Sequence, residues 1–75
     1  MEFLWDANNL AHLNGHGVNP ALAEAIFDAG RDAIHATSLR WRFVLEAEVE
    51  GRTYRLFFDR TPDGTRIYPV TCFPV

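Results

Sequence analysis

The chain has 75 residues, of which 48% are hydrophobic, and its formal net charge is −3 at pH 7. A chain of this length forms a single domain, residues 1–75, near the lower size limit for a self-sufficient core. All seven basic residues are arginines, and the acidic balance argues against a general nucleic-acid binder, because phosphate attraction supplies most non-specific affinity. The single cysteine, Cys72, excludes an internal disulfide framework. No leader-like or membrane-spanning apolar run occurs, so we expect a cytoplasmic domain with no membrane partner.

The first two elements are predicted from strong local signals. We expect a short strand over Glu2–Trp5 and a helix over Ala7–His16, with the Asp6 carboxylate accepting backbone N–H groups of the first turn. Gly17 suits the left-handed position that follows a last helical turn, and Val18 is then the residue that touches back onto that turn. Local chemistry therefore predicts both ends of this helix.

A second helix is predicted to begin at Pro20, where the missing N–H of proline costs nothing, with Asn19 as its cap. Gly30 is expected just after its last turn, and the segment 30–38 has no clear period and is expected to be a loop. The helix would present an apolar stripe formed by Leu22, Ala25, Ile26 and Ala29.

The clearest strand pattern lies in the segment 40–50, where the period changes from helical to two. Glu50 and Gly51 can form a two-residue turn, and counting outward from it gives the register of the partner strand. In this register the apolar faces coincide and the other face carries two opposite-charge pairs. The expected cross-strand pairs are Val49–Arg52, Ala47–Tyr54, Leu45–Leu56, Phe43–Phe58, Glu46–Arg55 and Arg42–Asp59.

A third strand is predicted over Ile67–Phe73, after a turn at residues 61–64 whose proline and glycine suit turn geometry. Pro69 cannot donate to a strand ladder, so we expect this strand at a sheet edge or with one ladder bond missing. Which of its residues face the helices depends on the length of the turn, and a bulge would exchange the two faces of the strand.

Together the elements predict an α+β fold in which two helices cover one face of a mainly antiparallel, three-stranded meander. The residues expected under the helices are Trp41, Phe43, Leu45, Leu56 and Phe58. The opposite face is expected to be half apolar, with Val44, Phe57, Tyr68, Val70 and Cys72. We therefore expect a second copy, a partner or a further segment to cover that face.

The opening stretch contains the pattern W-D-x-x-N-x-x-H-x-x-x-H-G-V, formed by Trp5, Asp6, Asn9, His12, His16, Gly17 and Val18. This pattern resembles the opening of BrnT-like toxins, the toxin halves of small bacterial type II toxin–antitoxin pairs, which have a compact RelE-like fold. The later segments N-P-A-L-A-E-A-I-F and G-R-T-Y-R-L-F-F-D resemble the second helix and the central strand of that family. The resemblance implies a cognate antitoxin as partner and a ribonuclease activity on RNA.

Ribonuclease chemistry of the RelE-like class activates a ribose 2′-hydroxyl against the adjacent phosphate, which needs a base, an acid and cations. The candidates for acid and base are His12 and His16, which lie four residues apart and can face the same way. Arg66, as a phosphate ligand, and Tyr68, for stacking or proton donation, complete the candidate catalytic set. The candidate substrate-binding residues are Arg52 and Arg55.

Several candidates also have a structural explanation. His16 near a helix end can act as a cap that interacts with the helix dipole, and Arg55 can simply pair with Glu46. The two histidines could also bind a metal with Cys72 or His35 as a further ligand. No spacing fixes such a set, so neither a metal nor a cofactor is predicted.

The end of the chain departs from the BrnT-like pattern, which has a final strand of the type R-I-I-S-A-R and then a C-terminal helix. Arg66 matches the first arginine, no second arginine follows it, and we expect a reduced form of the fold without the final helix. Two main hypotheses remain: a toxin-type endoribonuclease neutralised by an antitoxin, and a noncatalytic interaction domain that acts through a homodimer or a partner complex. A small metal-binding protein is the third.

Overall fold

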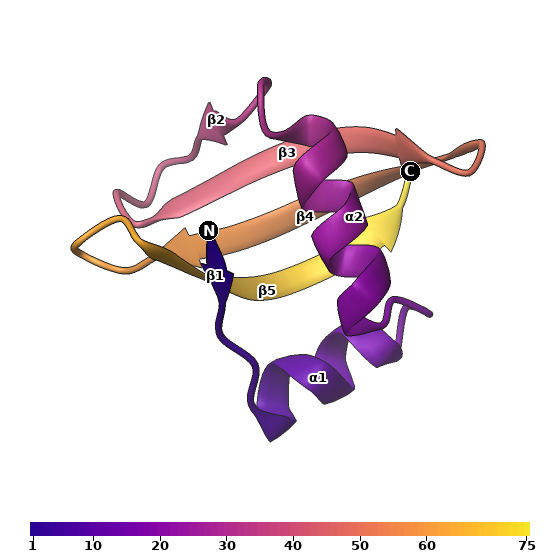
Figure 1. Cartoon of the computed structure of the whole chain (residues 1–75), viewed down its shortest axis with the longest axis horizontal. Coiled ribbons are helices and arrows are strands. Elements are labelled where there is room, and N and C mark those ends of the chain that lie inside the picture. The colour runs from indigo at the N-terminus through magenta and orange to yellow at the C-terminus, as the bar shows by residue number, and fades with distance from the viewer.

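The computed structural model describes all 75 residues, as one twisted sheet with two helices (Figure 1). The helices are α1 (Ala7–Asn14) and α2 (Pro20–Gly30). The strands are β1 (Glu2–Phe3), β2 (His35–Ala36), β3 (Arg42–Val49), β4 (Arg52–Arg60) and β5 (Arg66–Pro74). The sheet order is β1-β5-β4-β3-β2, with β1 parallel to β5 and all other pairs antiparallel. The predicted α+β fold is confirmed, but the sheet has five strands, because β2 forms within the expected loop.

The hairpin of β3 and β4 has the register that was counted from the sequence. All six expected cross-strand pairs are present. The turn residues Glu50 and Gly51 both have positive φ, 51° and 79°, as a tight two-residue turn requires. Both expected charge pairs form ion pairs. The prediction agrees with the structure on both faces of the hairpin, because the length of the turn sets which residues of the two strands are paired.

β5 differs from the prediction in its parity and in its place in the sheet. The ladder with β4 shifts register between Phe57 and Phe58, which leaves Val70 as an extra residue on β5. This bulge exchanges the faces, so Cys72 is fully buried under the helices, and its predicted place on the opposite face is wrong. The strand is also not a simple edge, since β1 pairs with its first two residues. Pro69 lies just beyond them, next to the bulge, where proline is tolerated.

α2 packs on the sheet with a different face from the one predicted. Its buried residues are Ala23, Ile26, Phe27 and Gly30, whereas Ala25 and Ala29 are exposed. Gly30 is the last helical residue, not the residue after the helix. A Cβ at Gly30 would lie 2.7 Å from Leu45 Cδ1, so the missing side chain lets α2 approach β3 closely. The face of α2 that is buried in this way carries the large Phe27 ring. Burial of this ring removes more apolar surface from water than burial of Ala25 or Ala29 would.

α1 lies beside β5 and is fixed there by one buried polar residue. Asn9 and Asp6 form a reciprocal capping box, each backbone N–H donating to the other side chain at 2.9 Å. The Asn9 side chain is only 2% exposed, and its Nδ2 also donates to the carbonyl oxygens of Leu4 and Pro69, at 3.0 Å each. One side chain therefore caps the helix and joins it to the sheet.

The far end of α1 closes as predicted, although the regular helix ends at Asn14 rather than at His16. Gly17 has a φ of 78°, and its N–H donates to the Asn14 carbonyl at 2.9 Å. The Val18 N–H donates to the Leu13 carbonyl at 3.0 Å. These two bonds are the pair that defines a Schellman ending, so the expectation for Gly17 and Val18 is confirmed.

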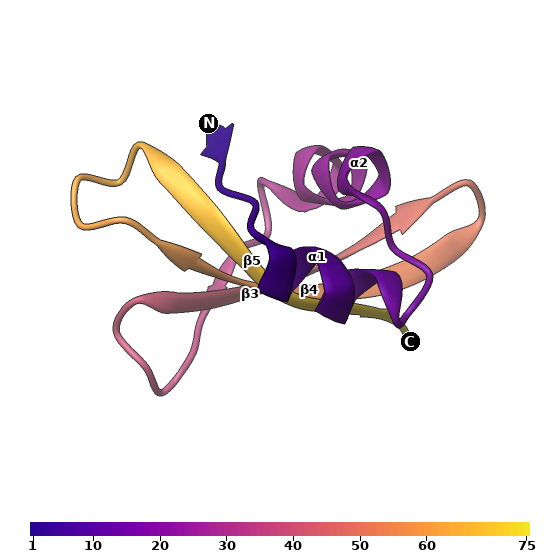
Figure 2. The same cartoon turned by 90° about the horizontal axis from the view of Figure 1, so that it is seen from below.

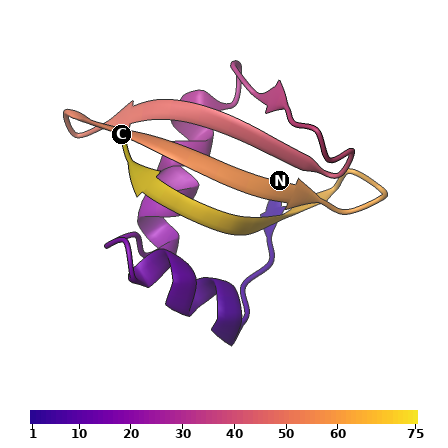
Figure 3. The same ribbon diagram turned by 180° about the vertical axis from the view of Figure 1, so that it is seen from behind.

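The core lies between the helices and one face of the sheet, as Figure 2 shows from the edge. Its largest fully buried side chains are Phe27, Phe58, Leu13, Ile26, Leu45, Leu56, Ile67, Val18, Pro69 and Cys72. Trp41 is not among them: it is 54% exposed, because β3 begins only at Arg42 and α2 does not cover that end of the sheet. The other face of β3, β4 and β5 has no helix over it (Figure 3), and we call it the outer face.

Candidate functional site

The two candidate histidines lie on the surface at the C-terminal end of α1. His12 is in the last turn of the helix and His16 is in the closing turn, and both are exposed. Their ring centroids are 5.9 Å apart and the rings meet edge to face. The spacing of four residues therefore brings the two imidazoles together, as expected.

His16 also contacts the sheet through Phe73 of β5. The centroids of these two rings are 5.9 Å apart, and the Phe73 ring lies 6.3 Å from that of Phe57. Arg55 is the ladder partner of Phe73, so its side chain lies on the same face of the sheet. We call His12, His16, Arg55, Phe57 and Phe73 the histidine cluster. It combines two titratable rings with one guanidinium at the border between α1 and the outer face.

The two candidate substrate-binding arginines have different surroundings. Arg55 Nε donates to Glu46 Oε2 at 2.7 Å, which confirms the predicted pair and neutralises the guanidinium locally. Arg52 is exposed beside the β3–β4 turn and forms no ion pair. Only Arg52 therefore offers an uncompensated charge, and it lies three residues away from Arg55 along β4.

Tyr68 holds the beginning of α1 against β5. Its hydroxyl oxygen is 3.0 Å from both carboxylate oxygens of Asp6, to which it donates. The backbone N–H of Asn9, helped by the Tyr68 hydroxyl, holds the pKa of Asp6 below its usual value. Desolvation, followed by the Asp6 carboxylate, raises the pKa of Tyr68. A phenol that is already donating and holds its proton more tightly suits a positioning role better than proton transfer near neutral pH.

Arg66 lies beside the turn that joins β4 and β5. The hydroxyl of Thr61, followed by the backbone N–H and hydroxyl of Thr65, lowers the pKa of Asp63 to about 2, and this carboxylate organises the turn. The Arg66 side chain is exposed there and forms no ion pair.

The candidate catalytic residues are spread over three places. The histidines are next to Phe73, which is seven residues further along β5 than Arg66. At the rise of an extended strand, that separation is roughly 23 Å. Tyr68 binds the other end of α1. The structure therefore places the two histidines next to Phe73, the ladder partner of Arg55, and far from Arg66.

The histidine pair has no third metal ligand. Cys72 is buried in the core, and burial raises the pKa of its thiol to about 11. His35 is on β2, at the opposite edge of the sheet from β1 and β5. No group of three His, Cys, Asp or Glu side chains is placed to hold a metal ion. The metal hypothesis therefore lacks its ligands.

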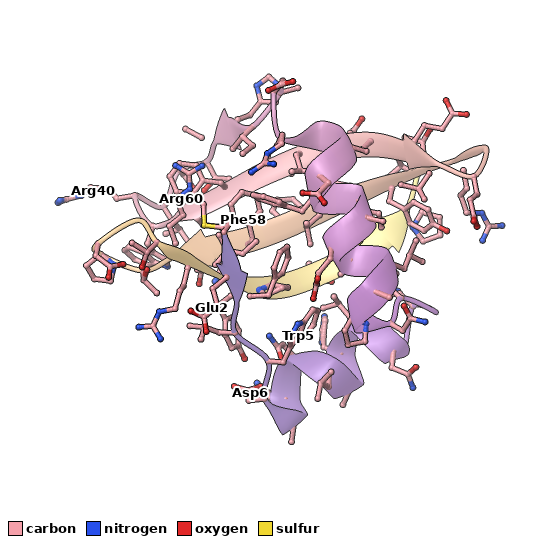
Figure 4. The ribbon with its side chains drawn as sticks, viewed as in Figure 1. Glu2, Trp5, Asp6, Arg40, Phe58 and Arg60 are labelled. Atoms are coloured by element: carbon pink, nitrogen blue, oxygen red, sulfur yellow. The ribbon has the colours of Figure 1, made fainter.

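A pocket of about 580 Å³ opens at the end of the sheet that α2 leaves uncovered. We call it the Trp41 pocket, and its lining residues are Arg40, Trp41, Phe43, Arg60, Thr61, Pro62 and Gly64. Figure 4 shows Arg40 and Arg60 at this end, away from α1 and α2. No carboxylate lines the pocket.

Two of these pocket residues could have been found from the sequence. The hairpin register, counted two more pairs outward from Phe43 and Phe58 and past Arg42 and Asp59, puts Trp41 opposite Arg60. The Arg60 N–H does donate to the Trp41 carbonyl, at 3.0 Å. The pocket also depends on which end of the sheet α2 leaves uncovered, and the sequence pattern does not show this.

Comparison with known protein families, with curated proteins and with solved structures found no match. The BrnT-like assignment therefore stays a prediction that rests on the residues of the opening motif. Two of those residues, Asp6 and Asn9, have a structural task here, since they cap α1 and join it to β5. Neither helix is long and apolar enough to cross a membrane.

Proposed function

We propose that this chain is a BrnT-like toxin component of a bacterial two-protein pair, and that its outer face binds the partner, an antitoxin protein. The opening motif supports the family, and the uncovered outer face supports the mode of action. Val44, Phe57, Val70 and Phe73 are half-buried on that side of the sheet with no helix over them. They lie beside two ion pairs, a mixture that is typical of interfaces between proteins that also exist apart.

The charges of the outer face favour a protein over a nucleic acid as its occupant. Arg42 Nε donates to Asp59 Oδ1 at 2.8 Å, and Arg55 pairs with Glu46, so both guanidinium groups are already neutralised. A phosphate backbone gains affinity from free cations, and these pairs supply none. A second copy of this chain, with its net charge of −3, would meet a like-charged surface, whereas a basic partner would be attracted.

The test is to express this chain alone and together with the product of the adjacent gene, and to follow growth and complex formation. Growth arrest that the second protein relieves, with a stable complex on a sizing column, is the expected result. Phe57→Glu and, separately, Thr71→Arg should weaken the complex, because these residues are ladder partners in the middle of the outer face. Asp28→Ala, on the exposed side of α2 and away from the outer face, is the matched control. A complex that survives both outer-face substitutions would contradict the assignment of this face.

The histidine cluster favours a second candidate function, cleavage of RNA. Two adjacent imidazoles supply the groups for a base and an acid. Arg55, which is opposite Phe73, would act as the cation only by exchanging its Glu46 partner for a phosphate. The test is the integrity of total RNA during induced expression, with His16→Ala and Arg66→Ala beside the parent. RNA degradation that His16→Ala abolishes and Arg66→Ala leaves unchanged is expected if the cluster is the site. Intact RNA during growth arrest would remove this function and leave partner binding.

A further inference from the structure

The Trp41 pocket differs in charge from the rest of this acidic chain. Three of the seven arginines, Arg31, Arg42 and Arg55, form ion pairs. Arg40 and Arg60 do not, and both line the pocket. Two carboxylates are sequence neighbours of lining residues, Asp59 and Asp63, and neither lines the pocket. Asp59 pairs with Arg42, and Asp63 is occupied by hydroxyl and N–H donors in its own turn. The pocket is thus a local positive site.

Arg60 has unused hydrogen-bonding capacity. Its guanidinium carbon lies 4.6 Å from the centroid of the Phe43 ring, a cation–π contact that holds the group in place. Its Nε is buried and has no hydrogen-bond partner in the structure. A buried donor without an acceptor costs free energy. The terminal N–H groups of the same guanidinium form no hydrogen bond or ion pair within the chain either, so they are left for an anionic ligand in the pocket. Arg40, which is exposed, can reach the same ligand from the rim.

Trp41 supplies the other half of a binding site. Its side chain is 54% exposed, which is unusual for the largest apolar side chain when a core is available. It lies beside Phe43, whose ring packs against Phe58 at 5.9 Å and continues the aromatic core. An exposed ring on a rigid support is a stacking platform for a planar group.

From this arrangement we propose that the Trp41 pocket binds a single nucleoside monophosphate, with the base stacked on Trp41 and the phosphate held by Arg40 and Arg60. Guanidinium groups bind phosphate through parallel N–H donors, which matches the free donors of Arg60. The volume of about 580 Å³ lies within the range of small-molecule sites. A free nucleotide fits better than a nucleic-acid strand, since only two cations are present and the chain as a whole would repel further phosphates. The inference does not rest on the toxin proposal.

The experiment is a titration of the full ¹⁵N-labelled chain with AMP, followed through the two tryptophan indole N–H signals and by calorimetry. Adenosine alone, inorganic phosphate alone and a short single-stranded RNA are titrated in parallel. AMP should move the Trp41 signal and leave the Trp5 signal in place. It should bind at least about tenfold more tightly than adenosine or phosphate, since stacking and phosphate contacts add. Trp41→Phe identifies the signal and should retain binding.

Variants separate the pocket from general charge attraction. Trp41→Ala and Arg40→Ala alter exposed side chains and should each weaken AMP binding about tenfold without changing the fold. Arg60→Lys keeps the charge and loses the planar donors, so it should also weaken binding. Arg52→Ala, an unpaired arginine at the other end of β4, is the matched control and should have no effect. No Trp41 shift at 10 mM AMP, equal binding of phosphate alone, or tighter binding of RNA than of AMP would each overturn the proposal.

Discussion

The Asn9 side chain makes three hydrogen bonds, and they need both the acceptor and the donor of its amide group. Its oxygen accepts from the Asp6 N–H, and its nitrogen donates to the carbonyls of Leu4 and Pro69. A side chain without an amide would leave at least the buried Pro69 carbonyl without a donor, because water has no access there. A residue of the family-like motif therefore has a structural role.

Replacing Asn9 should consequently destabilise the protein far more than replacing its neighbour. We expect Asn9→Ala to lower the free energy of unfolding by about 2–4 kcal/mol, from several unsatisfied backbone groups at once. Asn8→Ala removes an exposed side chain whose one contact is with the Tyr68 hydroxyl, so it should change the free energy by less than about 1 kcal/mol. Urea unfolding followed by circular dichroism measures both. Similar midpoints for the two variants would show that the Asn9 bonds do not hold α1 to β5.

Two glycines give a second residue-scale prediction, because an added methyl group would be crowded at one of them and accommodated at the other. A Cβ on Gly30 would lie 2.7 Å from Leu45 Cδ1 and 3.2 Å from the Glu46 carbonyl, so Gly30→Ala should cost about 1–3 kcal/mol through overpacking. Gly15 has helical φ and ψ, and its added Cβ would meet nothing closer than 3.4 Å. Gly15→Ala should therefore stabilise the protein by about 0.5–1 kcal/mol. Thermal unfolding midpoints should move in opposite directions.

At the scale of the elements, the sequence predicts most where structure depends on neighbouring residues. The β3–β4 register follows from one turn, and the start of α1 and the hydrogen bonds that close it follow from Asp6 and Gly17, so these predictions are confirmed. The faces of β5 depend on a bulge at Val70, and the buried face of α2 depends on how closely Gly30 approaches β3. Both are tertiary features with no local signal, and both predictions failed there.

The same limit applies to the candidate site. The i, i+4 spacing predicts that His12 and His16 meet, and they do. The contact between Phe73 and His16 requires that Phe73 lie on the outer face, and the bulge in β5 puts it there. The Trp41 pocket depends on where α2 stops covering the sheet. Sequence patterns identify chemical groups, but the packing of elements decides which of them become neighbours.

The contact between α1 and β5 predicts a pH dependence. The pKa of Asp6 is below its ordinary 3.8, so its contribution to stability is present above that value and is lost as pH falls through the folded-state pKa. The pKa of Tyr68 is above its ordinary 10.0, so its contribution is present below pH 10 and is lost as pH rises through the folded-state pKa. The stabilising window of the Tyr68–Asp6 hydrogen bond therefore lies between about pH 4 and pH 10.

Tyr68→Phe should remove this dependence. The loss in unfolding free energy relative to the parent should be greatest within that window and should shrink toward both extremes, because outside it the bond no longer stabilises the parent. Tyr54→Phe is the control, since the Tyr54 hydroxyl forms no hydrogen bond within the chain and lies at the far end of β4 from the Asp6 contact. Urea unfolding at a series of pH values measures both. A loss for Tyr68→Phe that stays constant with pH would mean that its ring packing, and not the carboxylate contact, holds the elements together.

On the scale of the whole molecule, one face of the sheet is covered and the other is open. All of the fully buried apolar side chains lie on the covered side, in a single cluster that joins α1, α2 and the three long strands. A domain of this size is stabilised by only about 3–5 kcal/mol. Because one cluster joins both helices and the three long strands, we expect the chain to unfold in a single cooperative step.

Cys72 offers a direct test of that cooperativity, since its thiol is fully buried within the cluster and burial raises its pKa to about 11. A thiol reagent attacks the thiolate of an accessible cysteine, so reaction should require the core to open. With a stability of about 3–5 kcal/mol, Cys72 should react roughly 10²–10⁴ times more slowly than an exposed thiol. The exposed reference is Val75→Cys in a Cys72→Ala background, because Val75 is 55% exposed. The rate at Cys72 should rise with urea as steeply as global unfolding does. A shallow urea dependence would show instead that β5 detaches on its own, and that the single cluster divides into two.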